Sequence, residues 1–244
     1  MGTVPPEPPR KEPVNQPSRP RLLIVCSANA IRSPFVEHLL RARFAAAGAV
    51  GPVLTSAGTA ARPGRSAEPH AVEIGREHGL DLAPHRTRLL DEAMLRESST
   101  VLCAAAVHRR TVLDMRPDAL DTTFTVREFA RLLREEHGAF REEGWESLVR
   151  RLARGRTRVR RTPGVDDDLV DPIGQPEAVW REFERAATDA VETIAVHAAP
   201  ALAEAAADRP PMTRREYRAR AQRGAGPGAS LDGGGALTPD GDPG

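Results

Sequence analysis

One short stretch, residues 22–35, constrains the fold of this chain more than any other, and it reads LLIVCSANAIRSPF. The aliphatic run Leu22–Val25 has the length and composition of a strand buried on both faces. Ser33-Pro34 then opens a segment whose apolar residues recur at helical spacing as far as Phe44. Residues 26–32 are therefore predicted to form a tight loop between a strand and a helix.

Strand and helix patterns alternate along the middle of the chain. Apolar strand signals lie at 22–25, 52–57, 99–103 and 122–126, and helical patterns lie near 34–48, 67–79, 107–115, 127–153 and 176–204. Such alternation predicts an α/β domain with a parallel sheet and right-handed crossovers. Ligands of these sheets bind beyond the carboxyl ends of the strands, which is where Cys26 is expected.

The length and composition favour a single domain with tails. A chain of 244 residues, 40% of them hydrophobic, can bury a sizeable core. Residues 1–20 are proline-rich and residues 205–244 are first basic and then rich in glycine and proline, so both are predicted to be disordered. The domain is expected over residues 21–204, with an arginine-rich insertion at about 130–163.

Charge and cysteine content exclude several classes of protein. The formal net charge of +1 gives no bulk attraction to nucleic acid, and no stretch has the pattern of a signal peptide or membrane span. Two cysteines, Cys26 and Cys103, fit a reducing compartment, so we expect a cytoplasmic protein that binds neither nucleic acid nor membrane. Seven arginines at 150–161, with no acid among them, would either attract an acidic partner or form a solvated surface.

The loop after the first strand carries the chemistry of phosphoryl transfer. Its N–H groups and the helix N-terminus would bind an anion, and the same dipole with a nearby guanidinium would favour the thiolate of Cys26. Arg32, six positions on, can give two parallel N–H bonds to a tetrahedral oxyanion, and Ser33 can donate to the sulfur. This predicts attack by Cys26 on phosphorus through a cysteinyl-phosphate, with no metal or cofactor. The predicted phosphate-binding loop comprises Ser27, Ala28, Asn29, Ala30, Ile31, Arg32 and Ser33.

The segment Val25–Pro34, VCSANAIRSP, resembles the signature V-C-x-G-N-x-C-R-S-P of the low-molecular-weight protein tyrosine phosphatase family. The likeness spans about residues 21–204, and it continues through Ser56-Ala57-Gly58-Thr59, through His85 in HGLDLAPHRTR, through the strand ending at Cys103, and to Asp171-Pro172. The resemblance implies a four-stranded parallel sheet of order 2-1-3-4 with helices on both faces. It also implies hydrolysis of phosphotyrosine or other aryl phosphate monoesters, on a phosphorylated protein or a small molecule.

The resemblance also implies roles for the matching residues. Cys26 would be the nucleophile, Arg32 the transition-state clamp and Asp171 the general acid. Asn29, Ser56 and His85 would brace the loop. The rival acids are Asp166, Asp167 and Asp168, none of which is followed by a proline that would stiffen its loop.

Several positions depart from the family pattern. Ala28 replaces the glycine of the signature and Ile31 replaces its second cysteine, which removes a partner that could protect an oxidised Cys26. Ile173 and Gly174 stand where the family usually has tyrosines, Arg62 or its neighbour stands where an aromatic residue is frequent, and Tyr217 is the only tyrosine. Weak stacking on a phenyl ring predicts little preference for phosphotyrosine peptides over small aryl phosphates.

Two other functions remain open at the level of sequence. One is an arsenate reductase, because Cys103 lies where such enzymes place a second cysteine. No third cysteine follows it, so that reductase would need an external low-molecular-weight thiol. The other is a non-catalytic phosphate-binding module, although the intact set of Cys26, Arg32 and Asp171 favours an enzyme.

Overall fold

The computed structural model describes residues 19–48, 51–136, 144–158 and 167–207. Four strands form one parallel sheet in the order β2-β1-β3-β4, which confirms the expected topology. The strands are β1 (Arg21–Cys26), β2 (Val53–Gly58), β3 (Thr100–Cys103) and β4 (Thr123–Thr125). The sheet is small, and its two central strands, β1 and β3, are buried throughout apart from Arg21.

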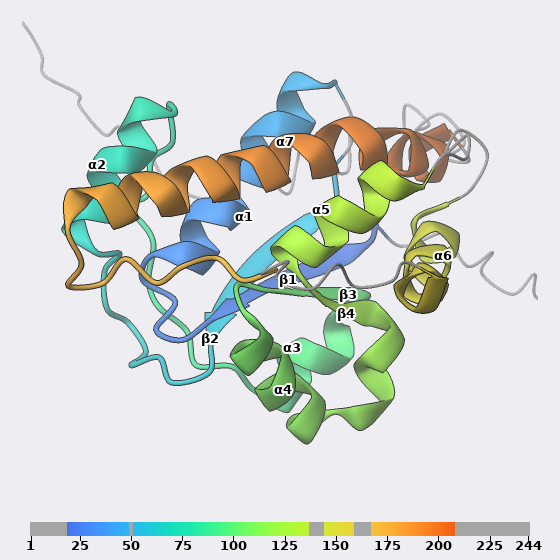
Figure 1. Ribbon diagram of the computed structural model, residues 1–244, viewed down its shortest axis with the longest axis horizontal. Coiled ribbons are helices and arrows are strands. Elements are labelled where there is room, and N and C mark those ends of the chain that lie inside the picture. The colour runs from blue at the N-terminus through green and yellow to red at the C-terminus, as the bar shows by residue number, and fades with distance from the viewer. Residues whose placement is uncertain (1–18, 49–50, 137–143, 159–166, 208–244) are drawn as a thin grey trace, which may run out of the picture. The chain divides into compact units, whose positions relative to one another are not determined.

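Helices cover both faces of this sheet (Figure 1). On one face lie α1 (Arg32–Ala46), α5 (Val126–Glu135) and α7 (Glu177–Ala207). Two further helices add to the same core, α2 (Pro69–Glu77) and, from the end of the sheet, α6 (Trp145–Arg158). On the other face lie α3 (Glu92–Glu97) and α4 (Ala106–Met115), followed by a 3₁₀ turn at Pro117–Thr122. The crossovers of a parallel sheet place helices in this way because each connection must return across a face.

The alternation of side chains along β1 separates two hydrophobic cores. Leu22, Ile24 and Cys26 belong to the larger core under α1, α5 and α7. Leu23 and Val25 point the other way and pack with α3 and α4. A strand that buries both faces needs apolar residues at every position, which explains the continuous aliphatic run in the sequence.

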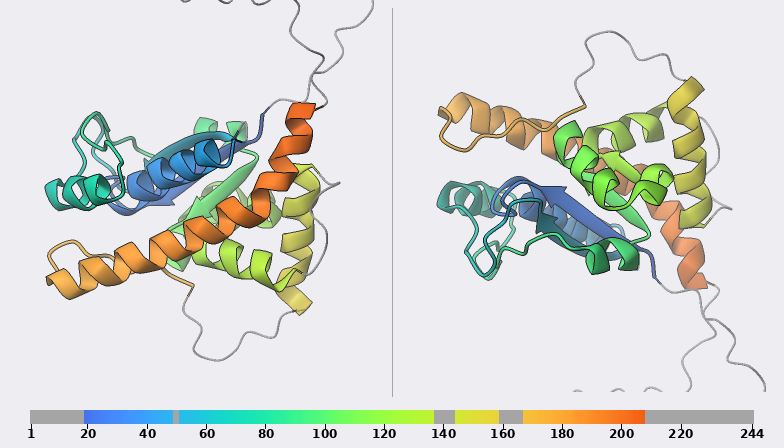
Figure 2. Two further views of the ribbon diagram at one scale, coloured as in Figure 1. Left: turned by 90° about the horizontal axis from the view of Figure 1, so that it is seen from above. Right: turned by 90° about the horizontal axis from the view of Figure 1, so that it is seen from below.

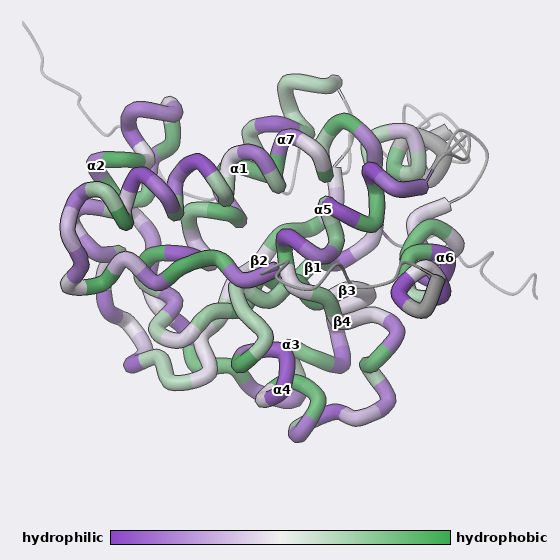
Figure 3. Tube along the Cα trace, viewed as in Figure 1, coloured by the Kyte–Doolittle hydropathy of each residue, from purple (hydrophilic) through white to green (hydrophobic). Residues whose placement is uncertain are grey.

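The long helix α7 closes the larger core. It crosses over the strands in Figure 2, and Figure 3 shows hydrophobic and hydrophilic residues interspersed along it. Its buried residues include Trp180, Phe183, Ala187, Val191 and Ile194, which are spaced by three or four positions. This spacing places them on one stripe of the helix, so α7 packs by a single face.

One helix prediction was wrong, and one helix was not predicted. The expected helix at 127–153 is two helices, because α5 ends at Glu135 and α6 begins at Trp145, with 137–143 outside the described residues. The short helix α3 was missed, because it buries only Leu95 and so carries no periodic pattern in the sequence.

The arginine-rich segment lies at the end of the sheet away from Cys26. Trp145 at the start of α6 donates its indole N–H to Thr100 Oγ1 (2.9 Å), and Arg156 bonds to the carbonyl of Thr123. Thr100 and Thr123 begin their strands, whereas Cys26 ends one. Binding of an acidic partner by this segment therefore stays a prediction. The surface it would use is remote from the loop that follows Cys26.

Some of these arginines already have partners within the domain. Arg156 forms an ion pair with Glu128 of α5 (3.1 Å) and stacks over the Phe124 ring at 3.9 Å from its centroid. Arg151 forms an ion pair with Glu136 (2.9 Å). Residues 159–161 of the segment lie outside the described residues. Part of the charge thus binds the insertion to the rest of the fold.

The expected tails are mostly outside the described residues. Residues 1–18 and 208–244 are not described, and α7 continues to Ala207, past the predicted domain boundary at 204. Within the described ranges, no helix combines the length and apolar character that a membrane span requires.

Candidate active site

The sulfur of Cys26 lies at the floor of a loop that wraps around it. Cys26 ends β1 and is 2% exposed. The backbone N–H of Asn29 donates to its Sγ at 3.3 Å, and Ser33 Oγ lies 3.0 Å from the same atom. Helix α1 begins at Arg32, and its N-cap, Ile31, supplies no side-chain acceptor. The N–H groups of its first turn thus remain available to an oxyanion.

A directed chain of hydrogen bonds fixes the proton of Ser33. The amide nitrogen of Asn29 donates to Ser33 Oγ at 2.9 Å and to Ser56 Oγ at 2.8 Å. The Ser56 hydroxyl in turn donates a hydrogen bond to Glu37 Oε2 at 2.5 Å. Because each hydroxyl already accepts from the amide, the Ser33 proton is free to point at Cys26 Sγ. This arrangement stabilises negative charge on the sulfur.

Asn29 adopts the strained backbone of the loop. Its φ is +54°, in the left-handed region that asparagine tolerates better than most residues. Its side-chain oxygen accepts from the N–H of Arg88 (2.8 Å), and its carbonyl lies 2.7 Å from His85 Nε2. The structure thus brings together the three predicted loop supports, Asn29, Ser56 and His85.

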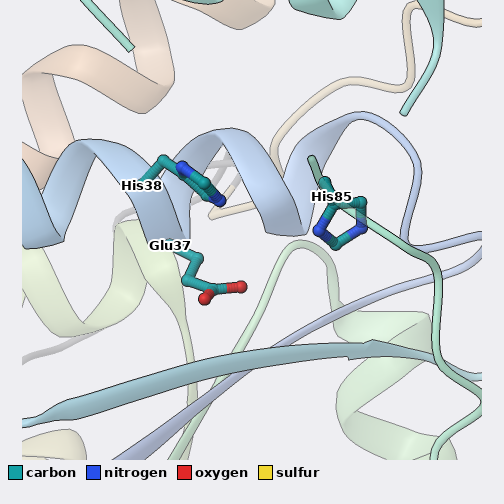
Figure 4. Close-up of side chains that lie close together, drawn as sticks. All are labelled: Glu37, His38 and His85. Atoms are coloured by element: carbon teal, nitrogen blue, oxygen red, sulfur yellow. The ribbon is translucent and has the colours of Figure 1, made fainter. Parts of the chain in front are cut away.

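Glu37, His38 and His85 form a cluster beneath the loop (Figure 4). One ligand atom from each lies within 4.8 Å of the others, a grouping that raises the question of a metal site. Both oxygens of Glu37 are already used, since Oε1 accepts from Arg41 (2.5 Å) and Oε2 from Ser56. The carboxylate therefore braces the loop, and a cation would have to displace the Arg41 guanidinium.

Burial shifts the pKa values of the two histidines of this cluster. It lowers the pKa of His38 and of His85 below the usual value for histidine, although the carboxylate of Glu37 opposes the shift. A neutral His85 with its proton on Nε2 can donate to the Asn29 carbonyl. No periodic pattern in the sequence marks Glu37, whose role depends on its position one turn after Ser33 on the buried face of α1.

Gly58, at the end of β2, is a further residue of the site that reasoning from the sequence missed. A Cβ built on it would lie 2.4 Å from the carbonyl oxygen of Ser27 and 2.8 Å from the nitrogen of Asn29. These atoms belong to the loop backbone and cannot move aside cheaply. The loop therefore requires glycine at this position.

Arg32 and Asp171 meet although 139 positions separate them in the chain. The Arg32 side chain is 6% exposed and forms an ion pair with Asp171, whose side chain is 41% exposed. Its guanidinium also donates to the carbonyl of Leu169 (3.3 Å) and to Ser27 Oγ (3.2 Å). Arg32 is thus buried beside the loop, as a residue that binds the substrate phosphate requires.

The neighbouring aspartates have other partners. Asp168 Oδ1 accepts from the N–H of Ala106 at the start of α4 (2.7 Å). Asp167 forms an ion pair with Arg131 (2.9 Å). Asp166 lies outside the described residues. Of the rival acids that the structure describes, each is thus bound to a neighbouring helix, whereas Asp171 contacts the predicted clamp.

The turn after Asp171 lacks the family's tyrosines. Ile173 is 56% exposed, and its N–H donates to Asp171 Oδ1 (3.4 Å). Gly174 has a φ of +67°, a conformation that favours glycine. Tyr217 lies outside the described residues. The aliphatic side chain of Ile173 thus follows the Asp-Pro pair at a position where the family resemblance predicts a tyrosine ring.

Cys103 cannot serve as a resolving thiol for Cys26 in this fold. It ends β3 beside Val25, and its side chain belongs to the core under α3 and α4, on the opposite face of the sheet from Cys26. It is fully buried, and this burial raises the pKa of its thiol far above the usual value. The prediction that Cys103 is a strand residue is confirmed.

Comparison with known proteins agrees with this geometry. The family described as low molecular weight phosphotyrosine protein phosphatase matches residues 21–142, half of the chain. A protein-arginine-phosphatase of Geobacillus stearothermophilus is 28% identical over 174 residues, 71% of this chain and 90% of that protein. A probable low molecular weight protein-tyrosine-phosphatase, EpsP of Ralstonia solanacearum, is 30% identical over 44% of this chain and 70% of its own length.

Solved structures give the same result. The YwlE arginine phosphatase of G. stearothermophilus superposes with a TM-score of 0.53 at 26% identity, covering 72% of this chain and 90% of that one. The low molecular weight protein tyrosine phosphatase of T. tengcongensis gives a TM-score of 0.54 at 27% identity, covering 72% of this chain and 97% of that one. With the Cys-x5-Arg-Ser loop at the end of β1, these matches lead to one conclusion: this chain belongs to the low molecular weight phosphotyrosine protein phosphatase family.

Proposed function

We propose that the protein is a phosphatase that hydrolyses phosphotyrosine or other aryl phosphate monoesters through a cysteinyl-phosphate. The observation that carries the proposal is the placement of Cys26 Sγ, which accepts hydrogen bonds from Asn29 and Ser33 at the uncapped start of α1. A sulfur held in this way is prepared to carry negative charge and to attack phosphorus.

In the first step, Cys26 Sγ attacks phosphorus and the ester oxygen leaves. The loop N–H groups and Arg32 hold the non-bridging oxygens, and Asp171 supplies a proton to the leaving oxygen. Arg32 must first exchange its partner, because a guanidinium has no acceptor for the proton of a carboxylic acid. A phosphoryl group, which is itself an anion, replaces Asp171 on the guanidinium. The released carboxylate takes up a proton from water or from the phosphate monoanion and then acts as the acid.

In the second step, water attacks the cysteinyl-phosphate and the thiolate leaves. The carboxylate of Asp171 now takes a proton from the water, and inorganic phosphate is released. The Ser33 hydroxyl, 3.0 Å from the sulfur, stabilises the departing thiolate. A free thiol nucleophile needs a reducing compartment, so we propose that the enzyme acts in the cytoplasm.

A second candidate substrate is phosphoarginine on a protein. The specific observation in its favour is the relative named a protein-arginine-phosphatase, which aligns over most of its own length. The replacement of ring-binding tyrosines by Ile173 also removes the feature that would favour a phenyl ring. The carboxylic acid of Asp171 would then donate its proton to the guanidinium nitrogen that leaves phosphorus.

Steady-state kinetics on one preparation test these alternatives. The substrates are 4-nitrophenyl phosphate, a phosphotyrosine peptide, a phosphoarginine peptide and arsenate with glutathione. Turnover of the phosphate compounds without release of arsenite supports a phosphatase, and the ratio of kcat/KM for the two peptides identifies the preferred side chain. Release of arsenite at a comparable rate would favour the reductase.

The control variant is Cys26→Ser. It should lose turnover and still bind phosphate within about tenfold of the parent, because the loop backbone and Arg32 survive the change. If the parent binds phosphate but turns over no substrate, the protein is a phosphate-binding module instead.

A further inference from the structure

His108 is a buried imidazole beside the phosphate-binding loop, outside the residues that the proposed mechanism uses. It lies in the first turn of α4 and is 2% exposed. Its Nε2 lies 2.8 Å from Ser27 Oγ, and Ser27 directly follows the nucleophile in the chain. The other face of the sheet thus contributes one polar side chain to the loop.

Ser27 links this imidazole to Arg32. The guanidinium donates to Ser27 Oγ at 3.2 Å, and the oxygen must be the acceptor because arginine has none. The other two partners of the Arg32 side chain, Leu169 and Asp171, belong to the loop before α7. Among the described partners of this guanidinium, Ser27 is therefore the one that belongs to the phosphate-binding loop.

The chemistry of His108 fits a role in holding Ser27. Burial, with a smaller contribution from the charge of Arg32, lowers the pKa of His108 to about 4, so the ring is neutral at pH 7. A neutral imidazole has one N–H and one bare nitrogen. Its Nδ1 is buried and has no hydrogen-bond partner among the described residues. The bond to Ser27 is thus the polar interaction that compensates the burial of this ring.

We propose that His108 is a positioning residue, which orients the Ser27 hydroxyl and thereby keeps the Arg32 guanidinium on the phosphate-binding loop. When a phosphoryl group displaces Asp171 from Arg32, the bond to Ser27 remains. The guanidinium then turns toward the oxyanion while its hydrogen bond to Ser27 holds it in place. The inference rests on the proposed phosphatase function, because it concerns the clamp of that reaction.

The test is a double-mutant cycle on His108 and Ser27. His108→Ala and Ser27→Ala should each lower kcat/KM about twofold to tenfold, the range that one hydrogen bond contributes. The double variant should lose no more than the single ones, because both remove the same link. Val107→Ala, at an exposed neighbouring position on α4, is the matched control and should leave the rate unchanged.

Conservative variants and two further readouts separate positioning from simple packing. His108→Gln should restore most of the rate, because the end of its amide reaches the place of Nε2 and can donate or accept there, whereas His108→Asn should not. Calorimetric binding of inorganic phosphate should weaken by the same factor as kcat/KM. Alkylation of Cys26 by iodoacetamide should keep its rate, because the hydrogen bonds to the sulfur come from Asn29 and Ser33.

Several results would overturn the inference. Additive losses in the cycle would mean that His108 acts independently of Ser27. Slower alkylation in parallel with slower turnover would mean that the substitution only loosens the loop. Because phosphate binding needs no turnover, a weaker affinity in His108→Ala supports the inference even if the parent hydrolyses nothing, and an unchanged affinity contradicts it. If His108→Ala fails to fold, Ser27→Ala with His108→Gln and His108→Asn gives the same comparison.

Discussion

At the scale of single residues, Asp171 has two tasks that cannot be performed together. In the structure its carboxylate is bound to Arg32, and in the proposed reaction it delivers a proton to the substrate. The occupant of the guanidinium decides which task is performed. Its role as general acid is therefore best tested where the leaving group most needs a proton.

Asp171→Asn should lower the rate by about 10²–10⁴ for a poor leaving group such as a tyrosine phenol. The loss in forming the phosphoenzyme should be much smaller for a nitrophenol, which leaves as an anion. Single-turnover release of phenols of graded acidity should show a steep dependence on leaving-group pKa in the variant and a shallow one in the parent. Asp168→Asn is the control, and a slope as steep as that of Asp171→Asn would move the acid role to Asp168.

Gly58 gives a second prediction at this scale. Gly58→Ala places a methyl group 2.4 Å from a loop carbonyl oxygen and 2.8 Å from the nitrogen of Asn29, so the loop backbone that donates to the sulfur must shift. We expect a loss of about 1–3 kcal/mol in the free energy of unfolding, typical of overpacking, and a larger relative loss of kcat.

The matched control for that change is Gly155→Ala in α6. Its added Cβ would meet Leu132 at an ordinary contact distance of 3.7 Å. Alanine in a helix interior is favoured over glycine by roughly 0.5–1 kcal/mol, so this variant should be as stable as the parent or more so, with unchanged activity. Denaturant unfolding and kinetics on both variants check the pair, and equal behaviour would remove Gly58 from the site.

At the scale of elements, the first strand, its loop and α1 could be predicted from the sequence because they are contiguous. Their signals are a continuous apolar run, a cysteine and an arginine six positions apart, and a helical period, all within one short segment. The partners of that loop could not be derived in this way. Glu37, Gly58 and His108 contact loop or strand residues that are distant from them in the chain, so no local pattern reveals them. Asp171 was identified only through the resemblance to a known family.

The division of α5 from α6 was missed for a related reason. Both helices carry apolar residues at helical spacing, and a continuous period across residues 127–153 hides the break. The capping box of Thr125 and Glu128 does mark where α5 begins. The sequence has no comparably clear mark at Glu135, where α5 ends.

Strand β3 carries a prediction about its last residue. Cys103→Ala should reduce stability by about 0.5–3 kcal/mol, as for most buried substitutions, and leave phosphatase rates within a fewfold. The reason is that its thiol lies on the far face of the sheet from Cys26. Thermal unfolding and steady-state kinetics provide the check. A loss of activity as large as that of Cys26→Ser would restore the reductase hypothesis.

At the scale of the whole molecule, three histidines couple stability to pH. Burial lowers the pKa of His38, His85 and His108 in the folded state, the last of them to about 4. The unfolded chain therefore binds protons first as the pH falls below about 6.5, the ordinary pKa of histidine. Stability should be fully present above that value and should decrease as the pH falls toward 4.

Urea unfolding at pH 7.5, 6.5, 5.5 and 4.5 measures this dependence. The free energy of unfolding should fall slightly between the first two values, because the unfolded histidines are half protonated at pH 6.5, and more steeply over the last two. His108→Gln cannot bind the proton, so its stability should depend less on pH in the same range. An identical slope in parent and variant would mean that His108 does not titrate differently on folding.

The hydrogen-bond chain from Asn29 to Glu37 also has a consequence for the evolution of the sequence. Each member has a fixed direction, with the amide giving to two hydroxyls, one hydroxyl giving to the carboxylate and the other to the sulfur. A substitution that turns a donor into an acceptor, or an acceptor into a donor, at one position brings two donors or two acceptors together at the next. Descendants of this chain can thus change these positions only by correlated replacements, so Asn29, Ser33, Glu37 and Ser56 should be inherited as a set while residues around them drift.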